Sequence, residues 1–186
     1  MNDKKGRFIV ALVGGSCVGK TTLESKMINE LNYSPVIICT TRKSRKDDPE
    51  HYKFFSEEEF SNYEKKDSFD YSFVSSEDTR YGYILPEKEL CVVSFINSKD
   101  AKTFLDMYSN DDKDHTYIFG ITTSKDNIEE CYKKRGMTKE SIHNRNIATT
   151  NKYSDDVYDR SVAFNNVSIL TNSFFSLISK DINYGK

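Results

Sequence analysis

The feature that most constrains this chain is an apolar run that ends abruptly in a glycine-rich segment. The run covers residues 8–13, and residues 14–21 (GGSCVGKT) follow it with the pattern GxxxxGK[ST]. A short, continuous apolar run predicts a strand buried on both faces, as in a parallel sheet. The residues from Lys20 to about Leu31 predict a helix. The sequence therefore predicts a strand, a glycine-rich turn and a helix in immediate succession.

This succession is suited to binding the phosphates of a nucleotide. Glycines let backbone N–H groups converge on phosphate oxygens, and the helix N-terminus adds positive potential. Lys20 would reach the β- and γ-phosphates of ATP, and the hydroxyl of Thr21 would ligate Mg²⁺. The alternative is an ordinary glycine turn whose lysine is solvated. The candidate ATP-binding residues of this segment are Gly14, Gly15, Ser16, Cys17, Val18, Gly19, Lys20, Thr21 and Thr22.

Four further apolar or β-branched runs, 36–41, 90–96, 117–122 and 162–164, predict more strands. Segments that can form helices lie between or after these runs, the last over 174–182. Strands that alternate with helices indicate an α/β fold. Together with the glycine-rich segment, they predict a three-layer P-loop NTPase-type fold with a central parallel sheet.

A length of 186 residues fits one domain. One part of it differs in composition, being polar and rich in tyrosine, with a short helix signalled by the capping box of Ser56 and Glu59. We interpret this part as an insertion. The predicted parts are a core (1–41, 86–134 and 158–186), an insertion (42–85) and a hydrophilic segment with some helical character (135–157).

Charge and apolar length argue against two classes of partner. Lys and Arg number 27 and Asp and Glu 29, for a net charge of −2 without blocks of like charge, so no nucleic acid partner is expected. The longest N-terminal apolar run has six residues, far below the roughly 20 that span a bilayer, so no membrane partner is expected either. Lys4, Lys5 and Arg7 before this run and Cys17 after it leave a secretion or lipoprotein signal as a weak alternative.

The four cysteines are scattered through the chain, with no CxxC pair and no neighbouring cluster of histidines. This pattern argues against a zinc site and against a disulfide framework. It favours a reducing, cytoplasmic setting. The residues are Cys17, Cys39, Cys91 and Cys131.

Two arginines, Arg42 and Arg45, lie three residues apart just beyond the second predicted strand, where both could converge on one anion. From this point the sequence resembles guanylate kinases over nearly its whole length. The segments that carry the resemblance are TTRKSR (40–45), HYKF (51–54), FDY (69–71), RYG (80–82), the lid-like RG (135–136) and ESIHNR (140–145), and the closing VAFNN (162–166).

The resemblance implies roles for single residues. Arg42 and Arg45 would hold the acceptor phosphate, to which the hydroxyls of two tyrosines would donate hydrogen bonds. Asp70 would accept hydrogen bonds from the N–H groups of the guanine ring. The resemblance further makes 42–85 an acceptor-binding insertion and 135–157 a helical lid, whose arginines would stabilise the negative charge that develops during transfer. Solvated arginines, core tyrosines and exposed ion pairs are the alternatives. The implied sets are Lys20, Arg42, Arg135 and Arg145 as catalytic residues, Arg42, Arg45, Tyr52, Asp70, Tyr81 and Tyr83 as acceptor-binding residues, and Asn165 as a further ATP-binding residue.

The sequence departs from the family pattern at positions expected to act. Ile38 and Tyr83 stand where hydroxyl-bearing residues would contact the base, and Ser94 and Ile96 replace an acidic pair, of which the first helps to place the hydration shell of Mg²⁺. Cys131 stands at the position of the first lid arginine. These differences concern base recognition above all.

The expected function is a nucleoside monophosphate kinase that transfers the γ-phosphoryl group of ATP, with Mg²⁺, to a purine nucleotide, GMP or dGMP. The expected partners are these small molecules, and the expected state is a monomer or homodimer. Two alternatives stay open. One is a catalytically weakened guanylate-kinase-like binding module, and the other is a kinase of the same fold for another nucleotide or a sugar phosphate.

Overall fold

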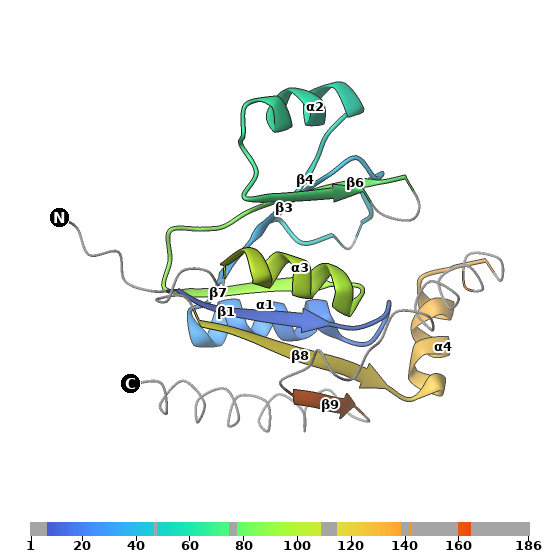
Figure 1. Ribbon diagram of the computed structural model, residues 1–186. Helices are drawn as coiled ribbons and strands as arrows, with labels where there is room; N and C mark the ends of the chain where they lie inside the picture. Colours follow the sequence, from blue (N-terminus) through green and yellow to red (C-terminus); the bar gives the residue numbers. More distant parts are fainter. Residues whose placement is uncertain are drawn as a thin grey trace.

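The computed structural model describes residues 7–46, 48–74, 78–108, 115–138, 142 and 160–164. These residues form two sheets, with the strand orders β2-β7-β1-β8-β9 and β4-β3-β6-β5 (Figure 1). The elements are β1 (Phe8–Val13), α1 (Lys20–Leu31), β2 (Ser34–Pro35), β3 (Ile37–Thr40), β4 (Tyr52–Phe54), α2 (Glu57–Lys65), β5 (Tyr71–Val74), β6 (Arg80–Ile84), β7 (Leu90–Phe95), α3 (Ser98–Tyr108), β8 (His115–Thr123), α4 (Lys125–Lys134) and β9 (Arg160–Phe164).

The five-stranded sheet, here the core sheet, is parallel and has β1 at its centre. β1 pairs in parallel with β7 on one side and with β8 on the other, and β9 extends the sheet beyond β8. Successive side chains of a strand point to opposite faces. Val10 and Leu12 therefore pack in one hydrophobic cluster with α1, while Ile9, Ala11 and Val13 pack in another with α3. Both faces are covered, as the continuous apolar run predicts.

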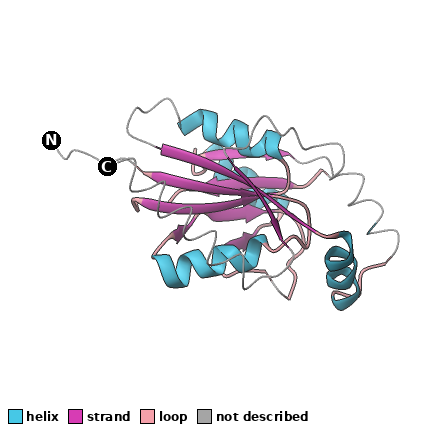
Figure 2. Cartoon of the chain, turned by 90° about the horizontal axis from the view of Figure 1, so that it is seen from below, coloured by secondary structure: helices cyan, strands magenta, loops and turns pink. Residues whose placement is uncertain are grey.

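Helices on the two faces of the core sheet give the predicted layers, and Figure 2 shows helices on either side of the strands. α1 contacts β7, β1 and β2, and α3 contacts β8, β1 and β7. The predicted α/β fold with a central parallel sheet is confirmed. The predicted strand and helix around the glycine-rich segment have the expected bounds, 8–13 and 20–31.

The second sheet is mixed and lies beyond α3 from the core sheet (Figure 1). Phe104 on α3 packs against Tyr71 and Tyr83 of this sheet and against Phe95 of β7, so aromatic rings join the two sheets. The insertion was expected to start at residue 42. However, β3 pairs with β4 and β6, so the sheet of the insertion already includes residues 37–40.

The helix α2 covers the outer side of the second sheet in Figure 1. Its predicted capping box is present, because the Ser56 hydroxyl accepts from the Glu59 backbone N–H and the Glu59 carboxylate accepts from the Ser56 backbone N–H. The Arg80 guanidinium lies over the ring of Phe60 at 4.5 Å and pairs with Glu64, which ties α2 to β6.

Some expectations lie outside the described residues. They are Arg145, Asn165, the helix expected over 174–182 and most of the lid expected over 135–157. Among the helices that are described, none combines the length and apolar composition needed to span a membrane.

Candidate active site

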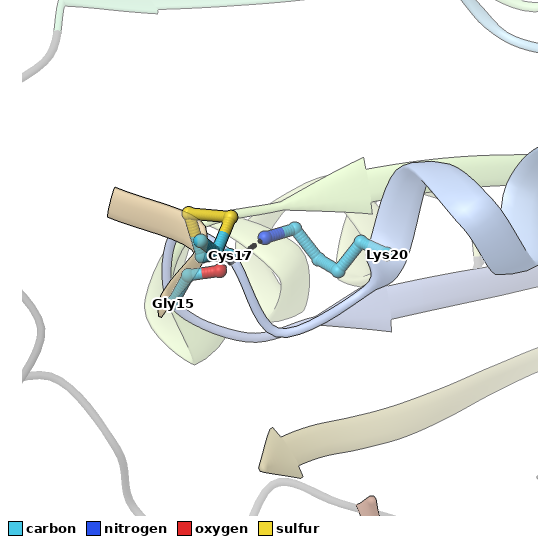
Figure 3. The surroundings of a disulfide bond; sticks show 4 residues. Gly15, Cys17 and Lys20 are labelled. Carbon is cyan, nitrogen blue, oxygen red and sulfur yellow. Dashed lines mark hydrogen bonds between the residues drawn. A yellow bond between two sulfur atoms is a disulfide. The ribbon is translucent and has the colours of Figure 1, made fainter. Parts of the chain in front are cut away.

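The glycine-rich segment forms a turn that closes around the amine of Lys20. Gly19 has a φ of 97°, a left-handed conformation that glycine adopts without strain, and it directly precedes α1. A Cβ atom at Gly14 would collide with the carbonyl oxygen of Ile121 on β8. The Nζ atom of Lys20 donates to the carbonyl oxygen of Gly14 at 2.6 Å and to that of Gly15 at 2.7 Å, and Figure 3 shows the bond to Gly15. The loop is therefore already shaped around its only lysine.

Three influences set the pKa of Lys20. Burial is the largest and disfavours the charged amine, the charge of Glu24 opposes it, and the nearby charge of Arg135 adds to it. Together they lower the pKa of Lys20 from 10.5 to about 8. Arg135 follows the last residue of α4, so this helix brings one predicted catalytic arginine near Lys20.

The structure contradicts the prediction against disulfides. Cys17 in the glycine-rich loop is bonded to Cys131 on α4, with their Cα atoms 5.9 Å apart, and Figure 3 shows this bond beside Lys20. The two residues are separated by 114 positions in the sequence, so no local spacing motif could reveal the pair. Cys39 and Cys91 are buried free thiols. The disulfide fixes α4, and with it Arg135, to the loop.

The oxygen-bearing side chains next to Lys20 fit a magnesium ion that is bound together with a nucleotide. Thr21 and Thr22 form the exposed first turn of α1. Nowhere in the described part of the chain do three or more His, Cys, Asp or Glu side chains gather as a metal cage. Mg²⁺ prefers few protein ligands, with waters and phosphate oxygens completing its shell. Thr21 would hold it through the hydroxyl oxygen.

Arg42 follows β3 and is held on several sides. Its two terminal nitrogens donate to the two carboxylate oxygens of Asp48, and its guanidinium lies 5.2 Å from the ring centres of both Tyr52 and Phe54. Burial alone would lower the pKa of Arg42, but the hydrogen bonds and charge of Asp48 outweigh it and raise that pKa. The group stays charged and fixed in direction.

Asp48 is a residue that sequence reasoning missed. Besides holding Arg42, it accepts a hydrogen bond from the backbone N–H of Arg45 at 2.6 Å. The pKa of Asp48 is lowered, because these hydrogen bonds outweigh its partial burial. An acidic residue just after the two arginines was the available signal in the sequence. Asp48 therefore fixes the loop that carries both predicted phosphate-binding arginines.

Two of the predicted acceptor-binding tyrosines gather with Arg42. The pKa of Arg42 is raised by the proximity of both Tyr52 and Tyr81. Burial, followed by the charge of Glu24, raises the pKa of Tyr52, so its hydroxyl remains a donor. Arg42, just after β3, therefore forms a cluster of donors with Tyr52 on β4 and Tyr81 on β6.

The residues that the resemblance assigns to the guanine base differ in how exposed they are. Asp70 is exposed, and its Oδ2 atom accepts from the backbone N–H of Leu85 at 2.7 Å, which occupies one of its two oxygens. Tyr83 is only 4% exposed and packs against Phe95 and Phe104. Ile96 is 55% exposed. Asp70 is thus accessible, whereas Tyr83 is part of the aromatic core.

Glu24 was also missed by sequence reasoning, although it lies one turn after Lys20. It is 2% exposed, and its carboxylate influences the pKa of both Lys20 and Tyr52. The loop that begins α1 and the donor cluster of the second sheet therefore lie on either side of one buried carboxylate.

Comparison with known proteins shows the fold and the family. The chain is similar in structure to the guanylate kinase from Anaplasma phagocytophilum, with a TM-score of 0.61 and 14% identity over 96% of this chain and 87% of that one. A search of curated protein sequences gave no match. The model of the family named guanylate kinase matches residues 5–180, nearly the whole sequence. The chain therefore belongs to the guanylate kinase family.

Proposed function

We propose that this protein is an ATP- and Mg²⁺-dependent nucleoside monophosphate kinase whose acceptor is GMP or dGMP. The observation that carries the proposal is a pair of hydrogen-bond donor clusters on either side of Glu24, each of which holds at least one basic side chain. Lys20 and Arg135 lie on the side of the glycine-rich loop, and Arg42 lies on the other side with two tyrosines. Two phosphate-binding clusters are what transfer between two nucleotides requires.

In this proposal the backbone of residues 14–21 and the amine of Lys20 hold the β- and γ-phosphates of ATP. Arg42, Arg45, Tyr52 and Tyr81 hold the acceptor phosphate. When bound at Thr21, Mg²⁺ neutralises charge on the phosphate oxygens.

Arg135 supplies positive charge close to the phosphoryl oxygens, where negative charge develops during transfer. Arg145 is proposed to act with it from the lid. Arg135 is held near Lys20 because α4 is bonded to the loop through Cys131. Closing the site would exclude water from the transferring group. Asn165 is proposed to contact ATP. We propose these reactions for a monomer or homodimer; the disulfide removes the cysteine argument for a reducing, cytoplasmic setting.

A second acceptor class, a sugar phosphate, is favoured by Ile38 and Ile96, the apolar residues that stand where the family pattern has base-contacting polar residues. Ile38 is 1% exposed, and Ile96 offers no hydrogen-bonding side chain. A guanine oxygen left without a donor would cost about 1 to 3 kcal/mol. A phosphate acceptor without a base would avoid this cost.

The test is ADP release from ATP with each common ribo- and deoxyribonucleoside monophosphate and with ribose phosphates. We expect GMP or dGMP to give the highest kcat/KM. Lys20→Ala should abolish turnover with the fold intact, whereas Lys53→Ala, an exposed lysine on β4, should not. Turnover that survives in Lys20→Ala would refute the kinase proposal, and a preferred sugar phosphate would refute the guanine acceptor.

A further inference from the structure

Glu24 is a buried carboxylate that touches both sheets. On the core side, the hydroxyl of Ser94 on β7 donates to its Oε2 atom at 3.0 Å. On the other side, its Oε1 atom lies 3.1 Å from Nε2 of His51, the residue before β4. One side chain thus connects the helix after the glycine-rich loop, the core sheet and the second sheet.

The contact between Glu24 and His51 is close but not a complete hydrogen bond. The Oε1 atom of Glu24 and the Nε2 atom of His51 are both buried, and neither has a hydrogen-bond partner among the described residues. A buried carboxylate is unfavourable unless donors surround it, and an apolar side chain of similar size would avoid that cost. Stability therefore gives no reason for a carboxylate at this position. His51 is the group that lies next to its Oε1 atom.

His51 is in turn fixed to the acceptor side of the site. Its carbonyl oxygen accepts from the backbone N–H of Ile38 on β3 at 3.0 Å. Its ring lies 5.4 Å from the ring of the next residue, Tyr52, which lies beside Arg42. The position of His51 therefore determines where β4 begins and where Tyr52 lies relative to Arg42.

We propose that Glu24 and His51 are positioning residues that dock β4 against α1, so that the hydroxyl of Tyr52 is correctly placed for the acceptor phosphate. This inference rests on the proposed function, because it takes Tyr52 to bind the acceptor. ATP would be held by the backbone of residues 14–21 and by Lys20, which His51 does not contact. Breaking the contact should therefore weaken acceptor binding and leave ATP binding unchanged.

The experiment compares steady-state kinetics of the full chain, with GMP and ATP varied in turn. His51→Leu and Glu24→Leu should each raise the KM for GMP about tenfold, because Tyr52 is no longer held in place, and His51→Leu should change the KM for ATP less than about twofold. The double variant should be no worse than either single one. His51→Gln places an amide nitrogen near the position of Nε2 and should restore most of the affinity. Glu30→Leu, on an exposed part of α1, is the matched control.

The outcomes separate this inference from the proposed function. Normal wild-type turnover with an unchanged KM for GMP in both leucine variants would refute the positioning role alone. Equal increases in both KM values, or additive effects in the double variant, would also refute it, because they indicate general damage to the fold. Absence of turnover in the wild type with every acceptor would refute the proposed function and this inference with it. If Glu24→Leu fails to fold, the comparison of His51→Leu with His51→Gln decides the question.

Discussion

Reduction of the disulfide between Cys17 and Cys131 should destabilise the protein strongly. The bond links residues separated by 114 positions, so it removes much of the conformational freedom of the unfolded chain. In the chain-entropy treatment, a closed loop of this size corresponds to about 16 cal/mol/K, or about 4.8 kcal/mol at 25 °C. In a chain of 186 residues, this free energy of unfolding corresponds to a fall in Tm of roughly 10 to 20 °C.

The assay is differential scanning calorimetry of the oxidised protein and of the protein treated with a phosphine reductant. Thiol titration in denaturant identifies the two forms, because the oxidised form keeps only Cys39 and Cys91 as free thiols. The double variant Cys17→Ser/Cys131→Ser should melt with the reduced wild type and should not respond to reductant. Its matched control, Cys39→Ser, should retain the response, because it leaves the disulfide in place.

The reasoning would be refuted if the oxidised and reduced proteins melted within about 2 °C of each other. That result would mean that the unfolded chain gains little freedom when the bond is cleaved, so residual structure would already hold its ends together. A fall in Tm that the double variant did not reproduce would assign the effect of reductant to another group.

Three further predictions concern the site. Arg45→Ala should raise the KM for the acceptor roughly tenfold or more and leave the KM for ATP unchanged, since a charge-assisted hydrogen bond contributes about 1.5 to 3 kcal/mol; equal effects on both would assign Arg45 to another site. Asp70→Asn should lower the ratio of kcat/KM for GMP to that for AMP, and an unchanged ratio would exclude Asp70 from base recognition. The pKa of Lys20 is about 8 in the folded protein and 10.5 when the amine is solvated. Between these pH values the unfolded chain keeps a proton on Lys20 that the folded protein has lost, so the free energy of unfolding rises with pH across this window. Relative to Lys20→Met, which has no titrating group at this position, the wild type should therefore gain stability in urea as the pH rises from 8 to 10.5, and a constant difference between the two would contradict this.

The sequence predicted best where the structure depends on neighbouring residues. An apolar run, the glycines and the helix after them are local signals, and β1 and α1 have the expected bounds. The capping box of Ser56 and Glu59 is equally local, since it closes within one helical turn. Backbone preferences alone are sufficient for such elements.

The features that could not be predicted depend on residues far apart in the chain. β3 is apolar like the core strands, but its pairing partners β4 and β6 place it in the second sheet. The contact of Glu24 with His51 and the bond of Cys17 with Cys131 cross between elements whose relative position only the packed fold determines. A sequence pattern identifies the elements but not which of their faces meet.

The geometry of the glycine-rich loop bears on where selectivity arises. Two of the three ammonium donors of Lys20 are already used by the carbonyl oxygens of Gly14 and Gly15. One donor is left for a phosphate oxygen, so binding ATP requires no reorganisation of the loop and forms few new bonds to this lysine. The loop therefore contributes a prearranged charge and backbone N–H groups, which any nucleoside triphosphate could use. Under the proposed function, discrimination between acceptors would then come from the acceptor side, where Asp48 holds Arg42 in one direction and Arg42 lies beside Tyr52.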